Sequence, residues 1–298
     1  MSDTLASLRR KISGAGDLES VVRSMKALAA ASIGQYERSV LALDGYYRTV
    51  ELGLVACLSN QGIDAVDRRS SNPVSPKTLN AIVFGSDQGL VGQFNDVLAN
   101  FVATTLAGVS AEKKVWAVGE RIHARLKDVG FAPTGLYRVP NSIHAITPLI
   151  GRILVETNSH DDTVAIDELI LFHNAPQSGA SYQPTSQQLL PLDSQWSRRL
   201  VKLPWPTKSL PQVIGPQGPT LSALVREYLF VSLFKACAES LASENASRLA
   251  AMQRAEKNIG EIIDRLNQTF RRLRQASIDE ELFDVVSGYE SLAKVTRH

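Results

Sequence analysis

Residues 240–288 read SLASENASRLAAMQRAEKNIGEIIDRLNQTFRRLRQASIDEELFDVVSG, and this proline-free stretch decides the fold. Apolar side chains recur at every seventh position, at Met252, Ile259, Leu266 and Leu273, and Ile263 and Phe270 fill the alternate positions. A seven-residue apolar repeat keeps one narrow seam of a helix against a partner helix and imposes a left-handed supercoil. The pattern runs back to Leu221, so we predict one long coiled-coil helix over residues 221–288.

A second long helix is predicted at the other end of the chain, over residues 3–60. Its apolar face is marked by Leu5, Leu8, Ile12, Leu18, Val21, Val22, Met25 and Leu28. Gly14 and Gly16 weaken this helix near its start and Asp17 is able to cap a restart, so we expect a local irregularity there. A helix of some 65 residues is roughly 100 Å long, more than a globular core covers. We therefore expect the terminal helices to pair antiparallel as a rod, with the middle of the chain folded at one end.

The middle of the chain alternates between strand-like and helical patterns. Short apolar runs predict strands at residues 79–84, 115–118 and 166–173, and helical patterns cover residues 91–106, 120–128 and 141–158. Such alternation with short links is typical of an α/β unit with a mostly parallel sheet. Residues 175–220 are rich in proline, which predicts a loop-rich return with one edge strand near residues 187–192.

The predicted fold class is therefore α/β plus a long antiparallel coiled coil, with the N- and C-terminal helices paired and a central Rossmann-like α/β domain. The segments are an N-terminal coiled-coil helix (1–60), a polar linker (61–77), the central α/β domain (78–210) and a C-terminal coiled-coil helix (211–298).

The two helices differ in length, so one is expected to overhang the other. The first covers about 58 residues and the last about 68, a difference of roughly 15 Å of helix. The overhang carries Leu282, Phe283, Val285 and Val286. An exposed apolar helical tip usually marks an interaction site. We therefore expect the chain to insert this tip into another protein.

Composition excludes several classes of protein. The formal net charge of +2 gives no strong attraction to nucleic acid or to anionic lipid. The only two cysteines, Cys57 and Cys237, lie in apolar helical patterns, which predicts small buried hydrophobes in a reducing compartment. The N-terminal sequence lacks the apolar core of a signal peptide, and no stretch reaches about 18 apolar residues without charge. A role at a membrane would therefore depend on an embedded partner.

The most suggestive loop for chemistry is SDQGLVGQFN, residues 86–95, which follows a predicted strand and opens a helix. It has neither the lysine of a P-loop nor the glycine spacing of a dinucleotide fingerprint, so we favour a tight structural turn over a nucleotide site. None of the five histidines has metal-ligand spacing. We predict no catalytic set, no metal and no cofactor.

Charges on the last helix form two groups. Basic residues come first, at Arg265, Arg271, Arg272 and Arg274, and acidic residues follow, at Asp279, Glu280, Glu281 and Asp284. Two interpretations remain open: a solvated helix surface, or an electrostatic track that meets charged loops of a partner.

The chain resembles the gamma subunit of F-type ATP synthases over essentially its whole length. Four stretches carry the resemblance: VVRSMKALAA at 21–30, SDQGLVGQFN at 86–95, LFHNAPQS at 171–178, and the C-terminal run from residue 240. The last contains the family pattern A-S-E-x-x-(S/A)-R-(M/L)-x-A-M, then A-x-x-N, then R-Q-A-x-I-x-x-E-L. The chain departs from the family at Val22, Ile33, Gln88, Asp279 and Gly288-Tyr289, which suggests a divergent branch, such as an alternative ATPase.

The resemblance implies a non-catalytic rotor shaft. It implies as partners a hexameric head of alpha and beta subunits, an epsilon subunit and a membrane ring of c subunits, with contact to the membrane only through that ring. It implies a peripheral location at the cytoplasmic face of the bacterial inner membrane. The coupling contacts carried over are Met25, Arg274, Gln275, Asp279 and Glu281, together with the tip at Leu282, Phe283, Val285 and Val286. The alternatives are a nucleotide-binding α/β protein with a scaffold role and a generic coiled-coil scaffold.

Overall fold

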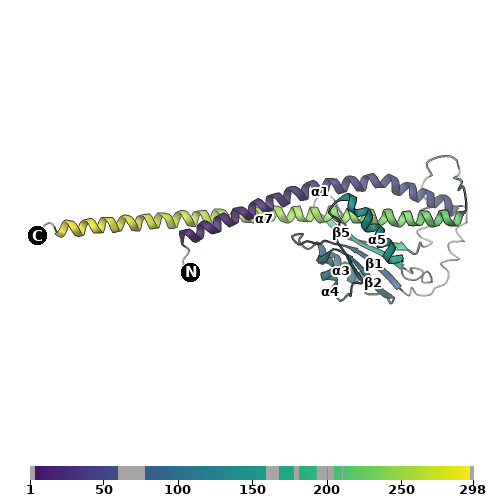
Figure 1. Cartoon of the computed structure of the whole chain (residues 1–298), viewed down its shortest axis with the longest axis horizontal. Helices are drawn as coiled ribbons and strands as arrows, with labels where there is room; N and C mark the ends of the chain where they lie inside the picture. The colour runs from purple at the N-terminus through teal and green to yellow at the C-terminus, as the bar shows by residue number, and fades with distance from the viewer. Residues whose placement is uncertain are drawn as a thin grey trace. The chain divides into compact units, whose positions relative to one another are not determined.

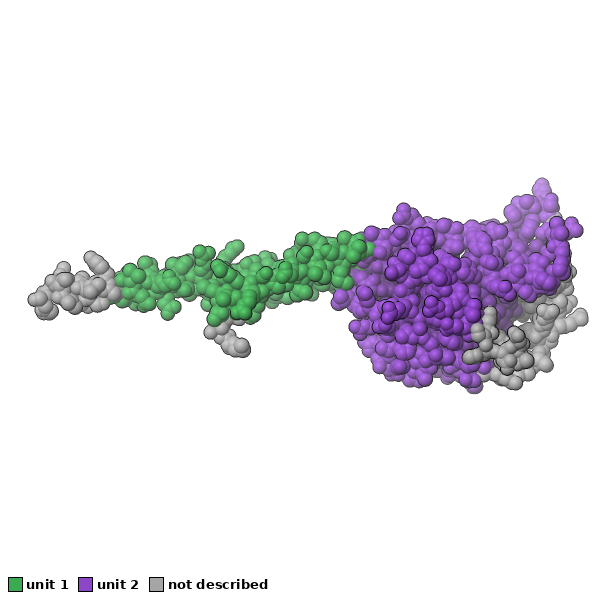
Figure 2. Space-filling view, viewed as in Figure 1, with its two compact units in different colours: residues 1–28, 249–298 green, residues 29–248 purple. Residues whose placement is uncertain are grey.

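The structure is a computed structural model that describes residues 4–59, 78–158, 168–177, 181–192, 200, 205–209 and 211–295. The predicted linker at 61–77, the start of the predicted strand at 166 and Ser178 of the family motif lie outside these residues. Contacts divide the chain into two compact units (Figure 2). We call residues 1–28 with 249–298 the helical-pair unit and residues 29–248 the α/β unit. Each unit contains parts of both terminal helices, so the four predicted segments stay a prediction.

The helical-pair unit consists of parts of α1 (Leu5–Ser59) and α7 (Gln217–Val295), drawn in purple and yellow in Figure 1. Near its start, α1 places Arg9 Cζ 5.5 Å from the ring centre of Phe270. Further along, Lys26 Nζ lies 2.5 Å from a Glu256 carboxylate oxygen and Arg23 Nε lies 3.4 Å from the other. Residue numbers rise along α1 as they fall along α7, so the two helices are antiparallel.

The seam of this pair follows the seven-residue repeat. Met252 is buried, and the other repeat positions, Ile259, Ile263, Leu266, Phe270 and Leu273, are half-buried. A single partner helix covers only a narrow stripe of a cylinder, which explains why most of these side chains keep some exposure. The predicted coiled-coil seam is confirmed.

The irregularity expected at Gly14 and Gly16 is wrong, because α1 is continuous from Leu5 to Ser59. A glycine inside a helix costs only about 1 kcal/mol relative to alanine. Breaking the helix there would sacrifice backbone hydrogen bonds on both sides and the seam contacts beyond them. The unbroken helix is therefore the more stable arrangement, because the two glycines cost less than the lost hydrogen bonds and contacts would.

The α/β unit is built on a five-stranded sheet of order β3-β2-β1-β4-β5. The strands are β1 (Thr78–Phe84), β2 (Glu112–Val118), β3 (Gly135–Tyr137), β4 (Glu168–Pro176) and β5 (Tyr182–Leu190). All neighbouring strands are parallel except β4 and β5, which are antiparallel. The helices between them are α3 (Phe94–Leu106), α4 (Glu120–Asp128), a 3-10 turn (Ile143–Ala145) and α5 (Ile146–Asn158). The predicted fold class is confirmed.

Several predicted boundaries are corrected. Helix α3 begins at Phe94 and not at Val91, because residues 86–93 form the turn that precedes it. Helix α5 begins at Ile146, after a separate 3-10 turn. Strand β5 begins at Tyr182 and carries Pro184 opposite Asn174, a position that an edge strand tolerates because its outer side needs no ladder bond. Strand β3, only three residues long, has no periodic signal in the sequence.

Both faces of the sheet are covered. Leu79, Ala81 and Val83 of β1 belong to a core cluster with residues of α3 and α4, such as Leu98 and Ile122. Ile82 and Phe84 point to the opposite face, since successive side chains of a strand alternate. They belong to a second cluster with α5 and with the segments of α1 and α7 in this unit, which contribute Leu54, Ile150, Leu233 and Ala238. Burial on both sides explains the continuous apolar run that predicted β1.

Cys57 and Cys237 are both buried, as predicted, and burial raises the pKa of both thiols. None of the described helices combines the length and the apolar character needed to cross a bilayer.

Gly85, at the end of β1, is expected to tolerate no side chain. A Cβ there would overlap Ile122 and lie 2.8 Å from Asn95 Oδ1. Gly85→Ala should lower the free energy of unfolding by about 1–3 kcal/mol through overpacking, measured by urea unfolding followed by circular dichroism. Gly151→Ala in α5 is the matched control, because nothing lies within 4 Å of its added Cβ. The control should be neutral or stabilising by about 0.4–1 kcal/mol. Equal effects of the two substitutions would contradict the close packing at Gly85.

Candidate functional site

The end of α7 extends past the start of α1 within the helical-pair unit (Figure 1). Because Arg9 lies over Phe270, Leu5 falls about one helical turn further along, near Arg274. Helix α7 continues to Val295, so about 20 of its residues, roughly 30 Å, lie beyond α1. The overhang is longer than the 15 Å predicted, because α7 continues past Gly288.

The overhang carries a cluster of exposed apolar side chains. Leu282 is 63% exposed, Phe283 73%, Val285 69% and Val286 49%. Leu282, Val285 and Val286 have the spacing of one helical face. Single exposed apolar residues are ordinary, but four within five residues form a patch of the kind that proteins use for binding. Four side chains at the tip are therefore free for a partner to cover.

The predicted coupling residues are only partly brought together. Arg274, Gln275, Asp279 and Glu281 are all exposed on α7, and the Gln275 amide Nε2 donates a hydrogen bond to Asp279 Oδ1 at 3.0 Å. Met25 lies apart from them, half-buried on α1 beside the Lys26–Glu256 ion pair. From Glu256 to Arg274 the helix rises roughly 27 Å. These residues therefore form two separate surfaces of the helical pair.

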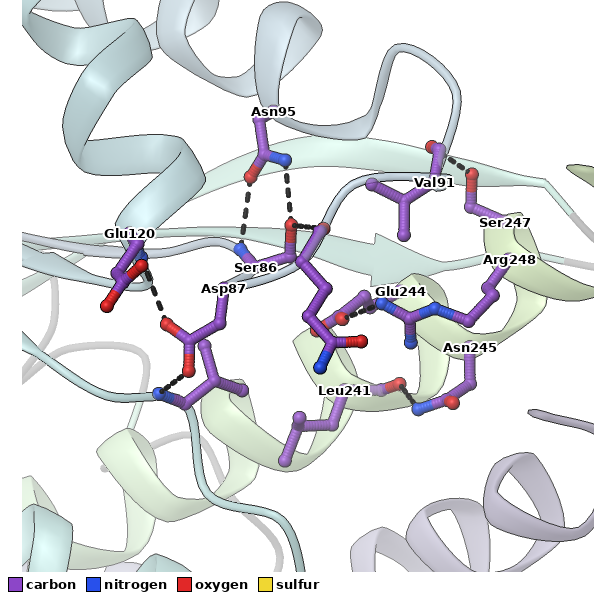
Figure 3. Close-up of polar contacts among 12 residues, drawn as sticks. Ser86, Asp87, Val91, Asn95, Glu120, Leu241, Glu244, Asn245, Ser247 and Arg248 are labelled. Carbon is purple, nitrogen blue, oxygen red and sulfur yellow. Dashed lines mark hydrogen bonds and ion pairs between the residues drawn. The ribbon is translucent and has the colours of Figure 1, made fainter. Parts of the chain in front are cut away.

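The turn at residues 86–95 is held by its own polar side chains (Figure 3). Ser86 N donates to Asn95 Oδ1 at 3.0 Å, and Asn95 Nδ2 donates to Ser86 Oγ at 2.8 Å. The Asp87 carboxylate accepts backbone N–H bonds from Glu120 and from Val139, each at 3.0 Å. These bonds tie the turn to the start of α4 and to the loop that follows β3. They support a structural turn over a phosphate cradle.

Strain in this turn is concentrated at Leu90, whose φ of 63° lies in the left-handed region. A branched side chain adopts that region only where surrounding contacts impose it. Leu90 is followed by Val91, a buried residue, while Leu90 itself is exposed. The turn thus presents one apolar side chain outward at an energetic cost.

Helix α7 contacts the turn through buried serines. Ser247 Oγ donates to the backbone oxygen of Val91 at 2.6 Å, and Ser240 Oγ donates to that of Phe84 at 3.0 Å. Short hydroxyl side chains allow a helix to approach a backbone closely and to donate hydrogen bonds to its carbonyl groups. The role of these serines is not among those predicted from the sequence. A signal for it is the spacing of Ser240 and Ser247, which lie two turns apart on one face of α7.

A buried ion pair lies on the same helix. Arg248 Nη2 is 2.6 Å from Glu244 Oε1, with side-chain exposures of 13% and 7%. Burial raises the pKa of Glu244, the Arg248 guanidinium opposes that rise, and nearby Asp87 adds to it. Within the described part of the chain, Glu244 Oε2 and Arg248 Nε have no hydrogen-bond partner. Both residues line a pocket of about 250 Å³ between α7 and the turn.

Among the described residues, no three His, Cys, Asp or Glu side chains gather in a way that could hold a metal ion. His173 is buried on β4 with its Nε2 2.8 Å from Glu239 Oε2 of α7, which joins the sheet to the helix.

Comparison with known proteins agrees with this architecture. The chain is 29% identical to the ATP synthase gamma chain of Geobacter metallireducens over 300 residues, which cover 97% of this chain and 99% of that protein. Two solved structures share its fold. One is the central stalk and c-ring of the Tetrahymena thermophila mitochondrial ATP synthase (TM-score 0.57, 21% identity, 79% of this chain and 99% of that chain). The other is the Euglena gracilis mitochondrial ATP synthase in rotational state 3 (TM-score 0.61, 18% identity, 97% and 94%).

The family comparison covers almost the whole chain. The sequence model of the family described as ATP synthase matches residues 4–292, which include α1, the α/β unit and α7 as far as residue 292. The resemblance to gamma subunits that the four sequence stretches carry is confirmed. The chain therefore belongs to the ATP synthase family.

Proposed function

We propose that this chain is the central rotor shaft of an F-type ATP synthase. The observation that carries the proposal is the antiparallel pair of α1 and α7 with an uncovered apolar tip, in a chain that matches the family over residues 4–292. The shaft couples ion-driven rotation of the membrane c-ring to conformational cycling of the catalytic beta subunits. The chain itself contributes no catalytic residue to ATP synthesis or hydrolysis.

The mechanism follows from asymmetry. A pair of helices has no three-fold symmetry, so three beta subunits around it make different contacts with it at any instant. A non-catalytic chain biases a conformational equilibrium only through such differential contacts. Continuous helices with a packed seam supply the stiffness for torque. Rotation of the pair then presents each beta subunit in turn with each of its faces.

The proposed contact surfaces are the two found on the helical pair. The tip at Leu282, Phe283, Val285 and Val286 sits in an apolar bearing of the alpha and beta head. Arg274, Gln275, Asp279 and Glu281 meet polar loops of beta just below it, and Met25 meets beta at a lower level. The α/β unit contacts the epsilon subunit and the c-ring. The complex is membrane-associated, and we place this chain at the cytoplasmic face of the bacterial inner membrane, held there through the ring.

The first test is assembly. Coexpression with the alpha and beta subunits of the same organism should yield a complex with one copy of this chain per three of each, measured by native mass spectrometry. A chain that stays monomeric beside a correctly formed alpha–beta head would contradict the proposal.

The second test concerns Met25. Met25→Lys should keep the helical pair folded but uncouple ATP hydrolysis from ion transport, because a new charge beside the seam makes an extra contact with beta. Coupling is measured as ion pumping per ATP hydrolysed in inverted vesicles. Met25→Leu is the control, since it conserves volume and adds no charge, and it should pump normally. If the lysine variant pumps as well as the leucine variant, Met25 does not contact the head.

The third test concerns the tip. Replacing both Leu282 and Val286 by glutamine should weaken binding to the alpha–beta head at least tenfold, since burying each aliphatic side chain contributes about 1.5 kcal/mol. Both residues are exposed, so the chain should fold normally. The control replaces their exposed acidic neighbours, Glu280→Gln with Asp284→Asn, and removes charge without apolar area. A larger loss of binding in the control would show that charge, and not apolar burial, seats the tip.

A further inference from the structure

A second pocket, of about 620 Å³, lies within the α/β unit at the edge of the sheet where β1 and β3 end. Both strands run parallel to β2, which lies between them. The wall of the pocket is formed by Asp87, by residues 136–141 and by the start of α5. Small-molecule sites usually measure about 300–1,000 Å³, and in open α/β sheets they lie outside the carboxyl ends of the strands. The pocket therefore has the size and the place of a small-molecule site.

Two guanidinium groups of the wall are accessible to a ligand. Arg138 follows β3 directly and Arg152 lies on α5, and both residues are exposed. Neither forms an ion pair or a side-chain hydrogen bond with another residue in the part of the chain that the structure describes. Glu156 follows Arg152 by one helical turn, the spacing of an ion pair, but its Oε2 accepts a hydrogen bond from the Tyr137 hydroxyl at 2.6 Å. Both cations are thus available to an anion.

The single carboxylate of the wall is engaged by the backbone. One oxygen of Asp87 accepts the N–H of Glu120 and the other accepts the N–H of Val139, each at 3.0 Å. The charged side chains that line the pocket are therefore two arginines and one aspartate, so the wall carries a positive excess. This excess favours an anionic ligand.

The rest of the wall is mainly apolar. Leu136, Val139, Pro148 and Leu149 line the pocket together with the two arginines. Leu136 is 44% exposed although it belongs to a strand. A simple inorganic anion would leave this apolar surface in water, whereas an organic body would cover it. The wall therefore fits a ligand with an apolar part and an anionic group.

We propose that this pocket binds an organic phosphate, with its body on the apolar wall and its phosphate between Arg138 and Arg152. A guanidinium presents donors in a fixed fork that matches phosphate oxygens. A phosphate monoester carries nearly two negative charges and three terminal oxygens, enough for two arginines, whereas a carboxylate carries one charge. The inference does not rest on the proposed rotor function, because every residue of the site belongs to the α/β unit of one chain.

Small probes test the chemistry on the full chain at constant salt. Phenyl phosphate, followed by NMR, should bind saturably with a dissociation constant on the order of 1 mM and shift signals of Leu136 and Asn141. Inorganic phosphate lacks the apolar body and benzyl alcohol lacks the charge, so each should bind at least tenfold more weakly. Equal binding of inorganic phosphate would show an adventitious ion only. Equal or tighter binding of benzoate would assign the pocket to a carboxylate, and no saturation up to about 50 mM would leave no site; each of these results overturns the proposal.

Matched variants place the site. The double variant Arg138→Gln with Arg152→Gln should weaken phenyl phosphate binding at least tenfold, and it should fold normally because both residues are exposed. Arg226→Gln is the control, since it removes the same charge from an exposed position of α7 outside the pocket wall. Leu136→Thr keeps a strand-forming residue and should weaken phenyl phosphate binding severalfold while leaving inorganic phosphate unchanged. Circular dichroism checks the fold of each variant. Phenyl phosphate binding that survives the double variant would refute the assignment.

Discussion

Packing between α1 and α7 is the interaction on which every other feature depends. One continuous helix, α7, meets two different environments along its length, and its sequence changes accordingly. In the helical-pair unit only α1 covers it, so its apolar residues form a narrow heptad seam of half-buried side chains. In the α/β unit it packs against both α1 and the sheet, so most residues from Tyr228 to Ala242 are buried. The same secondary structure thus serves as half of a coiled coil and as a core helix.

Within the α/β unit, polar groups determine how closely α7 approaches the end of β1 and the turn that follows it. Serine hydroxyls on its inner face bond the carbonyls of Phe84 and Val91, at the end of β1 and in the turn that follows. Asn95 and Asp87 satisfy other backbone groups of the same region. A buried carbonyl or N–H without a partner costs free energy comparable to a lost hydrogen bond, so these side chains fix the turn against the helix. Within the described residues, this framework leaves Glu244 Oε2 buried without a hydrogen-bond partner.

The proposed rotor function requires two different properties of the helices: a stiff packed seam, and exposed side chains that contact partners. Torque needs a stiff seam, which the heptad positions provide. Contact with changing partners needs exposed apolar and charged side chains, which the overhang of α7 provides without weakening the seam. Separating the two along one helix avoids a conflict, since the tip lies beyond the start of α1 and its side chains are exposed.

The sequence by itself determined the long helices, their antiparallel pairing, the parallel α/β unit and the apolar tip. These follow from periodicity, from proline positions and from chain lengths, all of which are local or additive. Only the tertiary structure decided that α1 runs unbroken through Gly14 and Gly16, that Pro184 lies in an edge strand, and that residues 135–137 form a strand at all. It alone brought Gln88 and Asp87 beside Glu244, more than 150 positions away along the chain. Such placements depend on hydrogen bonds and packing between residues that are far apart in the sequence. No local sequence pattern shows which of these contacts form.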